Sequence, residues 1–109
     1  MAEIETFHAH IYFDSDEIEA ARRLASEAEA LFAVSVGRFH DRPVGPHPRG
    51  SCQLTLAPER FGAFALWAAV NRRGLTIFAH PNTGDERADH VAHAVWFGPS
   101  ETLDLSVLD

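Results

Sequence analysis

The sequence lacks most of the features that mark secreted, membrane-spanning and nucleic-acid-binding proteins. Cys52 is the only cysteine in 109 residues, which excludes an internal disulfide and a zinc site built from several cysteines. No hydrophobic run approaches the length of a membrane span, and residues 1–5 have neither the basic nor the apolar part of a signal peptide. These absences favour a protein of the reducing cytoplasm.

Basic residues are scarce as well. Nine Lys and Arg residues stand against sixteen Asp and Glu residues, which gives a net charge of −7 with neutral histidines. Without a basic cluster, this charge argues against a nucleic-acid partner. A hydrophobic fraction of 46% is enough for a core, and the length suits one domain over residues 1–109.

Hydrophobic periodicity predicts four strands and two helices. Alternating or short apolar runs predict strands over residues 6–13, 34–40, 51–57 and 75–80. Apolar residues at spacings of three and four predict helices over residues 16–32 and 58–72, the second bounded by Pro58 and Gly74. The tail is expected to form one helical turn after Ala88 and an extended piece over residues 103–108.

This order, βαββαβ plus a tail, predicts an α+β ferredoxin-like fold. Right-handed crossovers put both helices on one face of a four-stranded, antiparallel or mixed sheet with strand order 4-1-3-2. We expect the first and third strands to run parallel. The other face is expected to be open and to serve as a binding floor or a dimer interface; it carries His8, His10, Tyr12, Ser51, Gln53, Thr55, Thr76, Phe78 and His80.

Histidines from separate segments are expected to meet at one end of this sheet. His8 and His10 lie two apart on one strand, so their side chains share a face. His80 ends another strand, and His47 lies in a rigid turn between two prolines. We therefore predict a divalent metal bound by His8, His47 and His80, with His10 as a fourth ligand or a base.

The identity of the metal stays open on these residues alone. An all-imidazole site suits Zn, Fe, Cu or Ni, whereas two histidines and one carboxylate suit non-haem Fe(II). The carboxylates within reach are those of Asp41, Asp85, Glu86 and Asp89. Arg38 and Arg42 are candidates for binding a substrate carboxylate, and Asp89 is a candidate for orienting His90.

Several segments together resemble the DOPA 4,5-dioxygenase family, in particular its bacterial branch. The matching pieces follow one another through nearly the whole chain: Phe7-His8-Ala9-His10-Ile11-Tyr12-Phe13-Asp14, Val36-Gly37-Arg38-Phe39-His40, Pro43-Val44-Gly45-Pro46-His47-Pro48, Leu75 to Asp85, Asp89-His90 and Trp96-Phe97-Gly98. The most specific of them are Val-Gly-Pro-His-Pro and His-Pro-x-Thr-Gly-Asp.

The resemblance implies a dimeric, ferredoxin-like, extradiol-type dioxygenase that uses Fe(II) and O₂ to open the ring of a catechol such as L-DOPA or a related small aromatic. A catechol bound in this way needs a base for its proton, and His10, His40 and His90 are the candidates. Arg38, Tyr12 and Asp89 are the expected substrate contacts. The competing interpretation is a metal-free or zinc-bound dimeric binding module without oxygenase activity; zinc or another divalent ion is also expected as a substitute for iron.

Overall fold

The computed structural model describes residues 3–108, so the predictions that involve Met1, Ala2 and Asp109 lie outside the described residues. Its strands are β1 (Thr6–Phe13), β2 (Ser35–His40), β3 (Gly50–Leu56), β4 (Thr76–Asn82) and β5 (Val95–Phe97). Its α-helices are α1 (Ile18–Phe32), α2 (Phe61–Asn71) and α3 (Glu86–His90). Short 3-10 helices occupy Ser15–Glu17, Pro58–Arg60 and Leu105–Leu108.

The strands form one sheet in the order β2-β3-β1-β4-β5. This confirms the predicted α+β fold and, read from the other edge, the predicted order 4-1-3-2. The sheet has a fifth strand that the sequence analysis missed, because β5 is only three residues long. The extended piece predicted over residues 103–108 was wrong, since Leu105–Leu108 is a 3-10 helix.

The prediction that the first and third strands run parallel was wrong. β1 pairs with β3 antiparallel, with Phe13 opposite Gly50. The reason is topological: the crossover makes β2 parallel to β1, and the direct return from β2 then reverses β3. Gly50 fits this junction because a Cβ there would lie 2.8 Å from the Phe13 carbonyl oxygen and 3.0 Å from that of His40.

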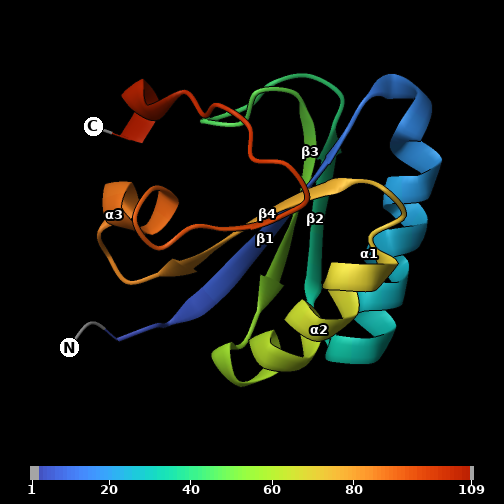
Figure 1. Ribbon diagram of the computed structural model, residues 1–109, viewed down its shortest axis with the longest axis horizontal. Helices are drawn as coiled ribbons and strands as arrows, with labels where there is room; N and C mark the ends of the chain where they lie inside the picture. The colour runs from blue at the N-terminus through green and yellow to red at the C-terminus, as the bar shows by residue number, and fades with distance from the viewer. Residues whose placement is uncertain (1–2, 109) are drawn as a thin grey trace.

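The core lies between the sheet and the helices α1 and α2, which Figure 1 shows together on one side. Ala9, Ile11 and Phe13 of β1 contribute to it, together with Leu24 of α1 and Phe64 of α2. This confirms the predicted strand alternation, because His8, His10 and Tyr12 occupy the other face. Leu31, one of the apolar residues whose spacing predicted the helix over residues 16–32, is 55% exposed.

The second face of the sheet is covered, although the sequence predicted that it is open. Tyr12 and Phe78 are fully buried there, and Trp96 stacks on Phe78 with ring centroids 4.6 Å apart. The covering segments belong to the chain itself: the loop before β3 and the stretch from α3 to the C-terminal segment (Figure 1). The prediction of an open face was wrong because these segments have no hydrophobic periodicity from which their packing on the sheet could be predicted.

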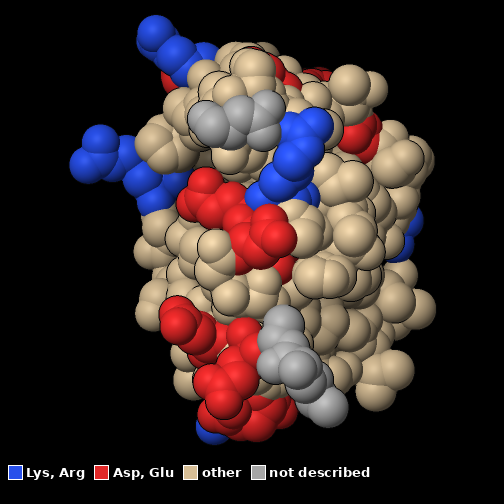
Figure 2. Space-filling view, turned by 90° about the vertical axis from the view of Figure 1, so that its left-hand side faces the viewer, with Lys and Arg blue, Asp and Glu red and all other residues tan. Residues whose placement is uncertain are grey.

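Acidic side chains gather on parts of the surface on the α3 side (Figure 2). Figure 2 shows Asp and Glu side chains gathered in two groups on this side, with a basic side chain beside the upper group. Such a surface repels a phosphate backbone, in line with the net charge of −7. None of the helices in residues 3–108 is long and apolar enough to cross a membrane.

Candidate metal centre

Three histidines from two neighbouring strands meet on the covered face of the sheet. His8 of β1 lies directly opposite His80 of β4, and His10 follows two residues further along β1. Each offers one ring nitrogen, and these atoms all lie within 4.8 Å of one another. The Nε2 atoms of His10 and His80 are 3.1 Å apart. The prediction that His8 and His80 come together is therefore confirmed.

Backbone carbonyls determine which ring nitrogen is available on two histidines. Nδ1 of His80 lies 2.9 Å from the Pro81 carbonyl oxygen, and Nδ1 of His90 lies 2.7 Å from that of Glu86. A carbonyl only accepts hydrogen bonds, so both Nδ1 atoms carry the hydrogen. In the neutral ring, Nε2 then keeps its lone pair, the arrangement found in metal-ligating histidines.

Burial keeps these histidines neutral. Desolvation, joined by the neighbouring imidazoles, lowers the pKa of His10 well below its usual value. Desolvation outweighs the hydrogen bond to Pro81 and lowers the pKa of His80 to about 4. Desolvation, followed by His90, also lowers the pKa of His8. At neutral pH these rings are therefore uncharged, as a metal ligand must be.

His47 lies next to this group without belonging to it. Its ring centroid is 4.1 Å from that of His10, but its Nδ1 atom bonds the Tyr12 hydroxyl at 2.8 Å. Burial lowers the pKa of His47 to about 4, with further contributions from His90 and His80. Because β3 is antiparallel to β1, the loop that carries His47 approaches Tyr12 and His10 and not His8.

Two cavities meet along His10, His47 and Gln53. The first has a volume of about 220 Å³ and is lined by His10, Gly37, Arg38, His40, Val44, His47, Ser51 and Gln53. The second, of about 230 Å³, contains the whole histidine group and is lined by His8, His10, Pro46, His47, Gln53, His80, Asn82, Glu86, His90 and Leu108. Together they form a binding space for a small molecule beside the histidines.

A bulge in β2 brings Arg38 to the first cavity. Three steps along β2, from Val36 to Phe39, oppose only two along β3, which leaves Gly37 and Arg38 against one partner residue. Such bulges redirect side chains and are frequent beside active sites. His40 lines the same cavity. Arg42 does not line it and pairs with Asp41 on the surface at 3.8 Å.

His90 lies on the other side of the group. Its ring centroid is 4.0 Å from that of His80, and its side chain lines the second cavity. It also lines a third cavity of about 250 Å³ between α3 and the C-terminal segment. Of the three predicted bases, His10 lies in the histidine group itself, whereas His40 and His90 lie on opposite sides of it.

Asp89 does not orient His90. Its buried carboxylate accepts hydrogen bonds from the Thr83 backbone N–H and hydroxyl, both at 2.7 Å, and pairs with Nδ1 of His93 at 3.2 Å. Burial would raise the pKa of Asp89, but the bonds from Thr83 and His93 outweigh it and lower the pKa. The helix starts earlier than predicted, with Asp85 as its N-cap. Asp89 thus anchors the loop after β4.

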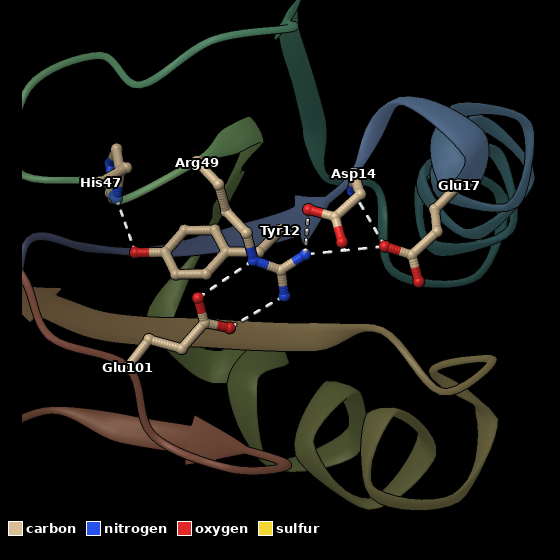
Figure 3. Close-up of polar contacts among 6 residues, drawn as sticks. All are labelled: Tyr12, Asp14, Glu17, His47, Arg49 and Glu101. Carbon is tan, nitrogen blue, oxygen red and sulfur yellow. Dashed lines mark hydrogen bonds and ion pairs between the residues drawn. The ribbon is translucent and has the colours of Figure 1, made fainter.

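Several contacts around the site were not predicted from the sequence. Gln53 contacts Nε2 of His8 through its amide nitrogen at 3.3 Å. Arg49 forms a two-pronged ion pair with Glu101, with contacts of 2.8 and 3.0 Å, and a third contact of 3.2 Å with Asp14 (Figure 3). Arg49 and Glu101 are 52 residues apart, so no spacing in the sequence marks the pair.

The family model described as the Dopa 4,5-dioxygenase family matches residues 7–107. The chain belongs to this family. Among proteins of the family, it is 34% identical over 98% of its length to a DOPA 4,5-dioxygenase from Amanita muscaria. It is 36% identical over 94% of its length to an uncharacterized 21.2 kDa protein from Botryotinia fuckeliana. The chain spans only 51% and 62% of these two relatives, respectively.

A crystal structure supports the assignment at the level of the fold. A protein from Nostoc punctiforme, described as a candidate dioxygenase, superimposes with a TM-score of 0.93 at 40% identity. The match covers 96% of this chain and 91% of that one. The arrangement of strands that carries the histidine group is thus shared with a solved structure of similar length.

Proposed function

We propose that this protein is a non-haem Fe(II) dioxygenase that opens the ring of a small catechol, with the metal held by His8, His10 and His80. The observation that carries the proposal is the convergence of three ring nitrogens within 4.8 Å in a chain of this family. His10 replaces His47 in the proposed ligand set, because His47 lies outside that group and bonds Tyr12.

The donor set fits a divalent metal. Three neutral imidazoles suit Fe, Zn, Cu or Ni, and the His80 ring is already held by a hydrogen bond from its far nitrogen. No carboxylate belongs to the group, so the proposed site has three histidine ligands. Bound Fe(II) would bind the catechol through its two oxygens and would activate O₂.

The surrounding residues supply binding and proton transfer. Nε2 of His90 has a free lone pair, since its Nδ1–H is used by Glu86, so it can take the proton of a catechol hydroxyl. On the other side, Arg38 and His40 line the first cavity and suit an anionic side chain on the ring. Cavities of about 220 and 230 Å³ favour a substrate with a single ring. L-DOPA and similar catechol acids have these properties.

The test is O₂ consumption by protein loaded anaerobically with Fe(II), measured against a panel of catechols with and without an acidic side chain. We expect uptake together with the absorbance of a ring-opened product, and no uptake by Zn-loaded protein because zinc is redox-inert. His80→Gln should abolish uptake, and His93→Gln, altered at a half-exposed residue outside the group, should keep it. A protein that binds no metal would support the binding-module interpretation instead.

We further propose that the protein is a homodimer. The apolar side chains of Leu66 and Val70 on α2 are 78% and 83% exposed, which leaves an apolar helix face for contact with another copy. Light scattering at high micromolar concentration should give twice the mass of the chain, 12.0 kDa. A monomeric mass would contradict this part of the proposal.

A further inference from the structure

Tyr12 and His47 form a hydrogen-bonded pair beside the histidine group. Tyr12 is fully buried, and its hydroxyl lies 2.8 Å from Nδ1 of His47 (Figure 3). The His47 ring lines both cavities that meet at the site. The ring nitrogen of His47 that carries the hydrogen therefore determines whether His47 offers a bound molecule a hydrogen-bond donor or an acceptor.

The position of the hydrogen in this pair follows from the surroundings of the phenol. Among residues 3–108, the hydroxyl of Tyr12 has no hydrogen-bond partner besides His47. A buried O–H group without an acceptor is costly, whereas an oxygen with an unused lone pair is tolerated more easily. The phenol therefore donates to Nδ1, and the neutral His47 ring carries its hydrogen on Nε2.

This arrangement is the opposite of that in His80 and His90. There, a carbonyl accepts from Nδ1–H and leaves the Nε2 lone pair free. At His47, a hydroxyl donates to Nδ1 and leaves an Nε2–H group. The same residue type is thus divided between two chemical roles by the partner of its other nitrogen.

We propose that Tyr12 fixes His47 as the tautomer with its hydrogen on Nε2, and that His47 donates this hydrogen bond to an oxygen of the bound aromatic substrate. Because Tyr12 donates to Nδ1, the hydrogen of the neutral His47 ring is held on Nε2 and that nitrogen is not a metal donor. His47 therefore contacts the substrate, and Tyr12 is its positioning residue. This inference rests on the proposed function for the identity of the acceptor, a catechol oxygen. The part of the inference that concerns the tautomer of His47 does not depend on any metal.

The first test is the tautomer of His47 in the metal-free protein, measured by long-range ¹H–¹⁵N correlation on ¹⁵N-labelled protein. The His47 signals are those missing from His47→Leu. We expect the hydrogen on Nε2 in the wild type and a mixture of both tautomers in Tyr12→Phe, which removes only the hydroxyl. A wild-type ring with its hydrogen on Nδ1 would overturn the inference, even if Tyr12→Phe failed to fold.

The second test uses Zn-loaded protein and the chromophoric ligand 4-nitrocatechol, so that binding is measured without turnover. His47→Leu should keep one zinc ion per chain and bind the probe at least about tenfold more weakly, as expected for a lost hydrogen bond to a charged oxygen. His93→Leu is the matched control and should change neither value, because this histidine lies outside the group. Loss of zinc, or unchanged probe affinity, in His47→Leu would refute the donor role.

The two tests separate failure of the inference from failure of the proposed function. If wild-type protein binds no zinc, the proposed metal centre fails, while the tautomer measurement still decides how Tyr12 and His47 share their hydrogen. If zinc binds but the His47 hydrogen is found on Nδ1, the metal centre stands and the donor role fails.

Discussion

The Nε2 atoms of His10 and His80 lie 3.1 Å apart, although the two residues are 70 positions apart in the sequence. Two nitrogen ligands at about 2.1 Å from one metal lie roughly 3.0 Å apart at a right angle and roughly 3.4 Å apart in a tetrahedron. The observed spacing falls between these values. The neighbouring strands β1 and β4 thus hold two donors at the separation that one ion requires.

Zn²⁺ should stabilise the protein through this group. At a free concentration one hundred times the dissociation constant, binding adds about 2.7 kcal/mol to the free energy of unfolding. Urea unfolding with and without Zn²⁺ measures this increase, and Mg²⁺, which prefers oxygen ligands, should add little. His80→Gln should lose most of the increase, while His93→Gln should retain it. Equal stabilisation of all three proteins would place the zinc elsewhere.

Strand periodicity alone was enough to predict the histidine face. Alternation over β1 separates His8, His10 and Tyr12 from the core residues between them, and the structure has the same division. The pairing of His8 with His80 follows from the strand order, which was also predicted correctly. These features depend on local pattern and on the handedness of crossovers, both of which can be determined from a single sequence.

The remaining features depend on contacts between distant segments without a regular pattern. β3 runs antiparallel to β1, and not parallel as predicted, so His47 lies near Tyr12. The third member of the group with His8 and His80 is therefore His10 and not His47. The second face of the sheet is covered by loops whose positions depend on individual hydrogen bonds. One example is the bond from the Asp104 backbone N–H to the Pro46 carbonyl at 2.9 Å.

The metal-free protein should lose stability as the pH falls below neutrality. The pKa values of His47 and His80 are about 4 in the folded state, against about 6.5 in an unfolded chain. Between these values the unfolded chain binds more protons, so stability is fully present above about pH 6.5 and declines toward pH 4. The expected loss is on the order of 1–3 kcal/mol for each histidine.

The measurement is urea unfolding in the presence of a chelator at pH 7.5 and at pH 5.0. Replacement of His80 by Asn should make the dependence on pH shallower, because one of the imidazoles with a lowered pKa is removed. Identical unfolding midpoints at the two pH values in the wild type would show that these imidazoles are not kept neutral by burial.

The ion pair between Arg49 and Glu101 should hold the C-terminal segment over Tyr12. The Arg49 and Glu101 side chains are 28% and 23% exposed, and the guanidinium carbon lies 5.9 Å from the centre of the Tyr12 ring. The hydrogen bonds to Glu101 and the one to Asp14 raise the pKa of Arg49 further above its usual value, so its guanidinium keeps its charge. Glu101→Gln should cost about 1–2 kcal/mol in stability.

A matched control is Glu27→Gln, which breaks the more exposed pair between Arg73 and Glu27 on the other side of the sheet. This surface pair should contribute less than about 0.5 kcal/mol. Hydrogen exchange should also show faster opening of residues 99–104 in Glu101→Gln and not in Glu27→Gln. Equal effects of the two variants would mean that the pair with Arg49 does not hold the segment in place.

Arg38 should select substrates that carry an acidic side chain. Its bulged position in β2 brings it to the cavity next to the histidine group, where its guanidinium can pair with a carboxylate. Arg38→Gln should raise the KM for a catechol acid about tenfold or more, since a hydrogen-bonded charge pair is lost, and should leave the KM for unsubstituted catechol nearly unchanged. The value of kcat should change little, because Arg38 does not belong to the proposed ligand group. Arg42→Gln is the matched control, as Arg42 is exposed and does not line the cavity. Equal increases in KM for both substrates would show that Arg38 supports the cavity wall and does not recognise the acid.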